Sequence, residues 1–212
     1  MYLEWHRNWV ADHSALYATA KDLPAGSTVV DVGANIGMMT CSLAVQRPDL
    51  KIVAIEPVPD NVECLHRNVT ENGIANVEII HAAASDKPGT VKVNINGPWS
   101  AVLEHGEVSV PAVSLDQFAD RNVSYIKIDA EGWEPYVLAG GHTILPLLRP
   151  LVFMEWNSWS LTLLCPRSLE IVRSHRNVFV GKAARRAKVR CRHHWRQHHQ
   201  TRQRQRHSHA AA

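Results

Sequence analysis

The sequence predicts an α/β fold built on a doubly wound, mainly parallel sheet. Three short runs of continuous apolar residues alternate with stretches of helical periodicity, which is the pattern of strands buried on both faces. The first run ends in a turn with two glycines, and a carboxylate stands near the end of each of the first two runs. Together these features indicate a ligand site at the carboxyl edge of the sheet.

The first part of the chain supplies three strands and two helices in alternation. Strands are expected at residues 28–33, 51–55 and 77–80, and helices at residues 35–46 and 60–72. Pro48 marks the end of the first helix. Asp60 is expected to be the N-cap of the second helix, which ends at Asn72-Gly73.

The pattern changes after the third strand. Residues 90–95 and 107–113 alternate between apolar and polar side chains, which predicts a half-exposed antiparallel pair. The elements that follow are a short helix opened by Ser114-Leu115-Asp116, a parallel strand at 125–129, a helical stretch at 135–147 interrupted at Gly140-Gly141, and a fifth parallel strand at 151–155.

The chain divides into three regions by composition. Residues 1–26 carry apolar side chains at helical spacing over 3–20 and are expected to pack as a helix on the core. Residues 27–181 are expected to form the main domain, with a further helix at 167–174 and a short strand at 177–180. Residues 182–212 have almost nothing to bury and are expected to be disordered.

The composition, 45% hydrophobic, is that of a soluble globular protein. No apolar run reaches the roughly 20 residues of a membrane span. The first ten residues include Glu4, His6 and Arg7, which is unlike a signal peptide. The four cysteines lie far apart without metal-ligand spacing, so we expect reduced thiols in a cytoplasmic protein.

The net charge of +3 conceals an acidic body and a basic end. Residues 182–212 hold ten lysines and arginines and no acid, while the remaining residues carry 13 basic and 20 acidic side chains. The histidine pairs of this end could bind a metal, and its arginines could bind RNA. A tract of histidine, arginine and glutamine usually binds both only adventitiously, and Trp195 is its only aromatic residue, so specific nucleic-acid binding is not expected.

Asp31 and Glu56 are the carboxylates at the ends of the first two strands. At the edge of an open α/β sheet, Glu56 is suited to accept hydrogen bonds from both hydroxyls of a ribose. Asp31 suits a cationic ammonium, which a phosphate site would disfavour. The spacing Gly33-x-x-x-Gly37 also differs from the G-x-G-x-x-G pattern of dinucleotide sites. The alternative is that Asp31 caps the turn and Glu56 is merely exposed.

Residues 31–37, Asp-Val-Gly-Ala-Asn-Ile-Gly, resemble motif I of class I S-adenosylmethionine-dependent methyltransferases. With Ile-Glu-Pro at 55–57, Val-Ser-Leu-Asp at 113–116 and Ile-Lys-Ile-Asp-Ala-Glu-Gly-Trp-Glu at 126–134, the chain resembles the FkbM family from about residue 27 to 157. The resemblance implies a Rossmann-like sheet of seven strands and S-adenosyl-L-methionine as cofactor. It also implies methyl transfer to a hydroxyl of a sugar, polyketide or other small metabolite.

The family pattern assigns a role to each matching residue. Asp31, Gly33, Asn35 and Gly37 would line the methionine end of the cofactor, and Glu56 would hold the ribose hydroxyls. Ser85 and Asp86 match the positions that contact adenine in related enzymes. Asp129 and Glu131 would lie near the transferring methyl group.

Methyl transfer to an alcohol requires the hydroxyl proton to leave, and a nearby carboxylate can act as general base. Asp129 is the first candidate and Glu131 the second. Alternatively, Glu131 and Glu134 stabilise the start of the helix that follows. Lys127 alternates with Ile126 and Ile128 and is expected to pair with a carboxylate. Magnesium bound by Asp129 and Glu155 is disfavoured, because no compact metal motif is present.

The end of the sheet departs from the family pattern. The family sheet closes with an antiparallel strand inserted beside the fifth parallel strand, and no apolar run after residue 180 can supply it. The fifth strand is therefore expected to have an unpaired edge. Three hypotheses remain open: an active methyltransferase, a truncated and catalytically impaired relative, and a nicotinamide-dependent oxidoreductase, which shares the acid at the end of the second strand.

Overall fold

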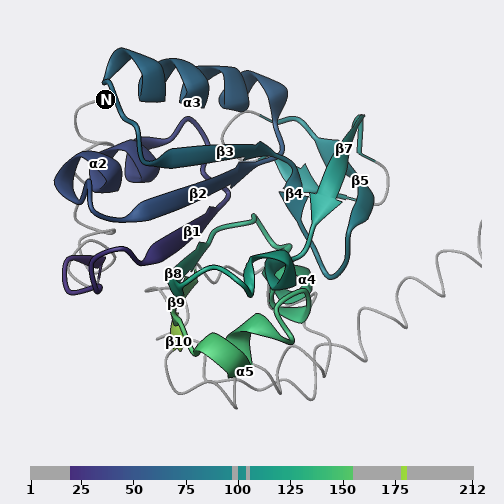
Figure 1. The fold of residues 1–212 in the computed structure, drawn as a ribbon. Helices are drawn as coiled ribbons and strands as arrows, with labels where there is room; N and C mark the ends of the chain where they lie inside the picture. Colours follow the sequence, from purple (N-terminus) through teal and green to yellow (C-terminus); the bar gives the residue numbers. More distant parts are fainter. Residues whose placement is uncertain (1–19, 97–99, 104–105, 155–177, 181–212) are drawn as a thin grey trace, which may run out of the picture.

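The computed structural model describes residues 20–96, 100–103, 106–154 and 178–180 of the chain (Figure 1). A large sheet flanked by helices lies beside a smaller sheet. The helices expected at 3–20 and 167–174 and the basic end at 182–212 lie outside the described residues. None of the described helices is long and apolar enough to cross a membrane.

The large sheet confirms the predicted fold class. In the described part of the chain it has six strands, all parallel, in the order β10-β9-β8-β1-β2-β3. Their bounds are Thr28–Val32 for β1, Lys51–Glu56 for β2, Val77–His81 for β3, Val123–Ile128 for β8, Leu151–Met154 for β9 and Val178–Val180 for β10. The strand order reverses between β1 and β8, which is where ligands bind in sheets of this kind.

The edge of β9 is paired, contrary to the prediction from the sequence. β10 lies parallel to β9, with Val178 opposite Val152 and Val180 opposite Met154. The expectation was wrong because it reserved this position for an antiparallel strand, whereas the next parallel strand itself occupies it.

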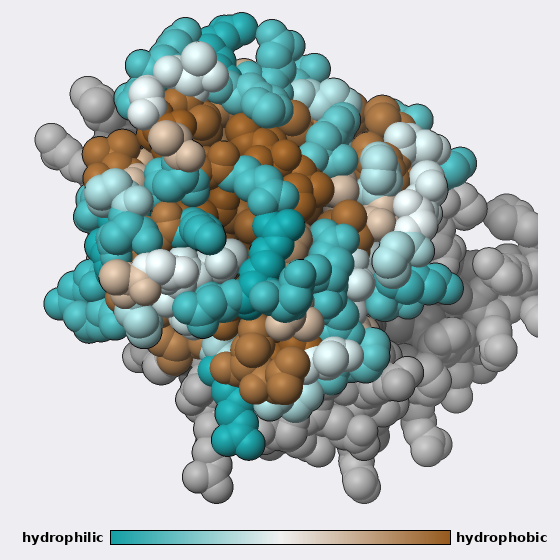
Figure 2. All heavy atoms as spheres, in the orientation of Figure 1, coloured by the Kyte–Doolittle hydropathy of each residue, from teal (hydrophilic) through white to brown (hydrophobic). Residues whose placement is uncertain are grey.

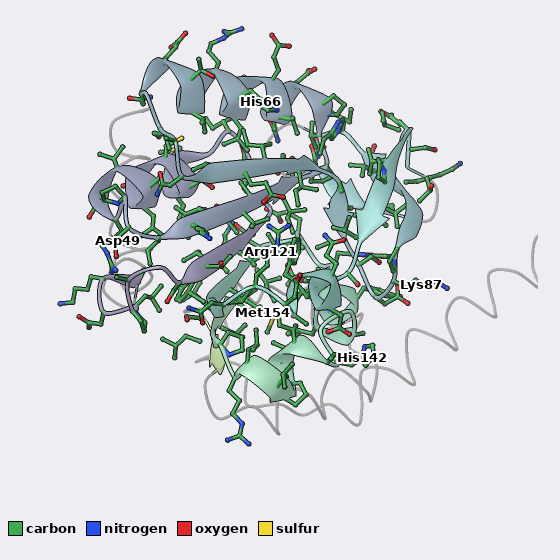
Figure 3. All side chains as sticks on the ribbon, viewed as in Figure 1. Asp49, His66, Lys87, Arg121, His142 and Met154 are labelled. Atoms are coloured by element: carbon green, nitrogen blue, oxygen red, sulfur yellow. The ribbon has the colours of Figure 1, made fainter. Side chains whose placement is uncertain are left out.

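Helices cover both faces of the large sheet (Figure 1). α2 (Met38–Gln46) and α3 (Pro59–Glu71) pack on one face through Met39, Leu43 and Leu65. The opposite face is covered by η2 (Leu115–Phe118), α4 (Glu134–Ala139) and α5 (Ile144–Leu148). Figure 3 shows Met154 of β9 inside the molecule, where it is fully buried.

Two helix boundaries differ from those predicted. α2 begins at Met38 rather than at residue 35, because Asn35 and Gly37 have φ angles of 54° and 86°, outside the helical region. Asp60 is not the N-cap of α3: Val58 occupies that position, and Pro59 takes the first helical position, where a missing N–H costs nothing. Asp60 therefore lies in the first turn.

The smaller sheet contains the predicted antiparallel pair. It has the order β4-β7-β5-β6, with bounds of Ala83–Ala84 for β4, Gly89–Asn94 for β5, Ala101–Val102 for β6 and Val108–Val113 for β7. β5 and β7 pair antiparallel, as expected. β4 and β6 were not predicted, because two-residue strands are too short to show a period.

Apolar side chains reach the surface in a few places. Figure 2 shows one concentration of hydrophobic residues on the α3 and β3 side of the visible face and a smaller one over α5. Leu147 of α5 has 64% of its surface exposed. Asp49, His66 and Lys87, labelled in Figure 3, lie at the periphery. The candidate site residues Asp31, Glu56 and Asp129 lie instead at or just after the carboxyl ends of β1, β2 and β8.

Candidate functional site

A pocket lies outside the carboxyl ends of β1, β2 and β8. Its empty volume is about 620 Å³, a figure that includes space open to solvent. The walls come from both sheets, because Ser100 and Val102 belong to the segment around β6. The lining residues are Val32, Gly33, Asn35, Ile55, Glu56, Pro57, Asn61, Ala83, Ala84, Ser100, Val102, Asp129, Ala130, Glu131 and Trp133.

The nine site residues predicted from the sequence divide into two groups. Five of them line this pocket: Gly33, Asn35, Glu56, Asp129 and Glu131. The other four, Asp31, Gly37, Ser85 and Asp86, are not among its lining residues in the described part of the chain.

The turn after β1 requires glycine at position 33. Gly33 has a φ of 72°, and a Cβ atom there would lie 1.8 Å from the Asp129 carbonyl oxygen. The Gly33 and Ala34 amides both donate to the Ile55 carbonyl oxygen, at 3.0 and 3.1 Å. The turn is thereby fixed to β2 and pressed against the end of β8, so three strand ends meet around one space.

Glu56 is held in a fixed orientation at the end of β2. One carboxylate oxygen accepts from the Asn35 amide at 2.8 Å, and the other accepts from the Val58 amide at 3.0 Å and the Asn61 side chain at 3.1 Å. The residue is only 4% exposed. Burial raises the pKa of Glu56, while the donors Val58, Asn61 and Asn35 oppose this rise. An acceptor oriented in this way is suited to a pair of ribose hydroxyls.

Asp31 has its partners inside the protein. It is fully buried, it accepts a hydrogen bond from the Thr40 hydroxyl of α2, and its other oxygen lies 3.2 Å from Lys127 Nζ. The sequence indicated a cationic partner for this carboxylate but not that the cation is a lysine of β8. Asp31 and Lys127 are neighbours in the β1–β8 register and share one face of the sheet.

Gly37 serves packing rather than the pocket wall. Its φ is 86°, and a Cβ atom there would lie 2.2 Å from Leu65 Cδ1 of α3. The glycine thus allows α2 and α3 to approach each other beside the turn.

Lys127 pairs with carboxylates, as predicted. Its ammonium group lies 3.2 Å from Asp31 and 3.5 Å from Asp129, and it donates to the Val32 and Gly33 carbonyl oxygens at 3.3 and 2.7 Å. The side chain is only 7% exposed. Burial by itself would lower the pKa of Lys127, but Asp31, Asp129 and Glu56 raise it above its ordinary value.

Ser85 and Asp86 contact each other and Trp133. The Ser85 hydroxyl donates to Asp86 at 3.1 Å and accepts from the Trp133 indole N–H at 3.2 Å. Trp133 also stacks on Tyr136, with ring centroids 3.9 Å apart. Ser85 therefore fixes the tryptophan, and it is the tryptophan that lines the pocket.

The turn after β8 aims Glu131 at the pocket. Glu131 and Gly132 both have positive φ angles, 49° and 100°. A glutamate whose backbone is in the left-handed region is strained. The buried Glu134 side chain holds this turn by accepting from the Ala130 and Gly132 amides at 3.0 and 3.1 Å. Burial, followed by the charges of Asp129 and Glu134, raises the pKa of Glu131 to about 7.

Several pocket residues were missed from the sequence. Asn61 orients Glu56, Ser100 and Val102 form the wall from the smaller sheet, and Trp133 supplies an aromatic surface. Of these, only Trp133 carried a signal, because it lies within the motif at residues 126–134. Within the described residues, no group of three or more histidines, cysteines or carboxylates could hold a metal ion, and Glu155 lies outside them.

Comparison with known proteins identifies the family. Residues 31–179 match the model described as the methyltransferase FkbM domain. Among curated proteins, the ribosomal RNA small subunit methyltransferase G of Mycobacterium ulcerans (strain Agy99) is 32% identical over 105 residues, which cover 50% of this chain and 56% of that protein. The protein of the same name from Mycobacterium marinum is 38% identical over 80 residues, which cover 38% of this chain and 34% of that protein.

Two solved structures are also similar. The methyltransferase FkbM of Methylobacillus flagellatus KT has 21% identity and a TM-score of 0.46, covering 60% of this chain and 32% of that one. The precorrin-6y C5,15-methyltransferase of Geobacter metallireducens GS-15 has 14% identity and a TM-score of 0.48, covering 76% and 68%. The chain spans between about a third and just over half of the first curated relatives it matches.

Proposed function

Since this chain belongs to the FkbM methyltransferase family, we propose that its pocket binds S-adenosylmethionine and that the protein methylates a hydroxyl of a small metabolite, such as a sugar or polyketide. The observation that carries the proposal is the position of Glu56 at one side of the Gly33 turn and of Asp129 and Glu131 at the other. Glu56, which can accept hydrogen bonds from ribose hydroxyls, and the carboxylates of Asp129 and Glu131 then lie on either side of the Gly33 turn. The glycine lets a ligand come close to the main chain there.

The residues present fit this cofactor. Glu56 offers oriented oxygens for two ribose hydroxyls, and Ile55, Ala83 and Ala84 offer an apolar surface for adenine. The carboxylates of Asp129 and Glu131 favour a cationic ligand over an anionic one. When bound, S-adenosylmethionine supplies an activated methyl group on a positively charged sulfur, so the protein must align the acceptor oxygen and take its proton.

Glu131 is the better candidate for the general base. A base that works near neutral pH has a pKa near neutral, and that of Glu131 is raised to about 7. The Asp129 carboxylate, by contrast, is paired with the Lys127 ammonium group, which also contacts Asp31. We therefore place Glu131 first and Asp129 second, the reverse of the order drawn from the sequence, with Asp129 stabilising positive charge at the methionine end.

We expect Glu131 to titrate in the folded protein with a midpoint near pH 7, as followed by the carboxyl 13C resonances of labelled glutamate. Between about pH 4.5 and 7, Glu131 loses its proton in the unfolded chain but largely keeps it in the folded protein, because its folded-state pKa is raised. The free energy of unfolding of the wild type therefore falls as the pH rises through this range. Glu131→Gln should therefore gain thermal stability relative to wild type over this range.

Glu63→Gln, at an exposed position of α3, is the control and should show no such gain. A Glu131 midpoint below pH 5, or a gain that does not depend on pH, would contradict this electrostatic assignment.

RNA is the second candidate acceptor, favoured by a specific observation. Curated relatives at 32–38% identity are named as ribosomal RNA methyltransferases, and residues 182–212 hold ten basic residues and no acidic one. The excess of acidic residues in the rest of the chain opposes docking on a polyanion. We therefore rank the small acceptor first. We also propose a cytoplasmic location, because the four cysteines lie far apart in the sequence, as is typical of reduced thiols.

A transfer assay with S-adenosylmethionine labelled in its methyl group separates the two acceptors. The full chain is incubated with a panel of sugars and polyketide alcohols and, separately, with ribosomal RNA. We expect the label in a small product, and we expect its methyl group to resist the mild base that cleaves methyl esters. Label in RNA that is lost when Arg202, Arg204 and Arg206 are replaced by serine would instead favour the second candidate.

A further inference from the structure

Lys127 is a buried cation that contacts the ends of β1 and β8, two of the three strands around the pocket. Three of its four oxygen neighbours belong to residues that line the pocket: the Val32 carbonyl at 3.3 Å, the Gly33 carbonyl at 2.7 Å and the Asp129 carboxylate at 3.5 Å. The fourth is the buried Asp31 of β1, at 3.2 Å. Lys127 therefore joins the wall built by β1 to the wall built by β8.

Asp31 connects this cation to helix α2. It bonds to the Thr40 hydroxyl with one oxygen and approaches Lys127 with the other, and it is fully buried. A buried charge is costly unless it is paired and hydrogen-bonded. Asp31 provides that pairing for Lys127, so the position of the ammonium group is set from α2 through Thr40 and Asp31.

The same contacts set the charge of the pocket. Asp129 and Glu131 line it, and Lys127 is the cation that faces Asp129. Its charge also acts on Glu131, whose pKa it lowers against the larger effects that raise it. Loss of this ammonium would leave the carboxylates of the β8 turn without their internal counter-ion.

We propose that Lys127 is a positioning residue: its ammonium group fixes the Gly33 turn and the Asp129 carboxylate in the arrangement that receives the methionine part of the methyl donor. This inference rests on the proposed function. Lys127 acts through Gly33 and Asp129, and Asp31 and Thr40 act through Lys127. The adenosine part of the ligand, bound at the Glu56 side, does not depend on this chain of contacts.

Two ligands separate the two parts of the site. S-adenosylhomocysteine carries the amino-acid end, and 5′-deoxy-5′-methylthioadenosine lacks it while keeping the adenosine and a thioether. The double variant Asp31→Asn, Lys127→Met removes both members of the buried pair, so neither Asp31 nor Lys127 is left as an unpaired buried charge. Asp129, whose side chain is 26% exposed, loses the Lys127 ammonium. We expect calorimetry to show about a tenfold loss of affinity for S-adenosylhomocysteine and a change of less than about twofold for methylthioadenosine.

The milder variant Thr40→Val keeps both charges and removes only the hydroxyl that orients Asp31. We expect about a threefold loss for S-adenosylhomocysteine and none for methylthioadenosine. Lys51→Met, at the exposed start of β2, is the matched control and should bind both ligands as the wild type does.

Equal losses for the two ligands in both variants would overturn the inference, since a general loosening of the fold affects the whole pocket. Unchanged binding of S-adenosylhomocysteine would overturn it as well. If the wild-type protein binds neither ligand, the proposed function fails and the inference fails with it. Thermal unfolding of each variant shows which part of any loss reflects the fold.

Discussion

Replacing Gly33 by alanine is expected to abolish binding of S-adenosylmethionine and to lower the free energy of unfolding by about 3 kcal/mol. Two costs add at this position. The φ angle of 72° is unfavourable for alanine, and the new methyl group would lie 1.8 Å from the Asp129 carbonyl oxygen, a main-chain atom of the opposite wall. Chemical denaturation and calorimetry measure the two effects.

Gly73→Ala provides the matched control. Gly73 has a similar φ of 63°, but a Cβ atom there has no neighbour within 4 Å. This variant should lose only about 1 kcal/mol and should keep its affinity for S-adenosylmethionine. Equal effects of the two substitutions would show that position 33 does not need glycine to avoid a clash with the Asp129 carbonyl oxygen.

Replacing Glu56 by glutamine is expected to weaken binding of S-adenosylmethionine by about a hundredfold. All three contacts that Glu56 makes with Asn35, Val58 and Asn61 are accepted from N–H donors. An amide group at either carboxylate position would face one of these donors, so the side chain must lose a contact and its orientation. Calorimetry on the variant measures the change.

Glu56→Ala would be a poorer test of the ribose assignment. The side chain is nearly fully buried, so its removal would leave three donors unsatisfied and reduce the stability of the fold as well. Glu63→Gln on α3, an exposed position, serves as the control. Retention of wild-type affinity by Glu56→Gln would remove the assignment of Glu56 to the ribose.

The strand ends could be predicted because their signal is local. Continuous apolar runs located β1, β2, β3, β8 and β9, and the residue that follows such a run lies at the edge of the sheet. Glu56 was placed in this way, whereas Asp129 and Glu131 were assigned to the site by the family resemblance. All three line the pocket.

The direction in which a side chain faces could not be predicted in the same way. Asp31 carried the same local signal as Glu56, yet its carboxylate faces Lys127, a residue remote in the sequence. Ser85 faces Trp133 for a similar reason. Such pairings depend on strand register across the sheet and on the conformation of turns, and neither is encoded in a short window of residues.

Titration calorimetry of the full chain with S-adenosylmethionine tests the central claim most directly, with NAD⁺ titrated in parallel. We predict binding of S-adenosylmethionine at a single site, retained in Gly73→Ala and lost in Gly33→Ala, and no binding of NAD⁺. Heat of binding from NAD⁺ alone, or no heat from S-adenosylmethionine with a folded protein, would contradict the assignment of this pocket to a methyl donor.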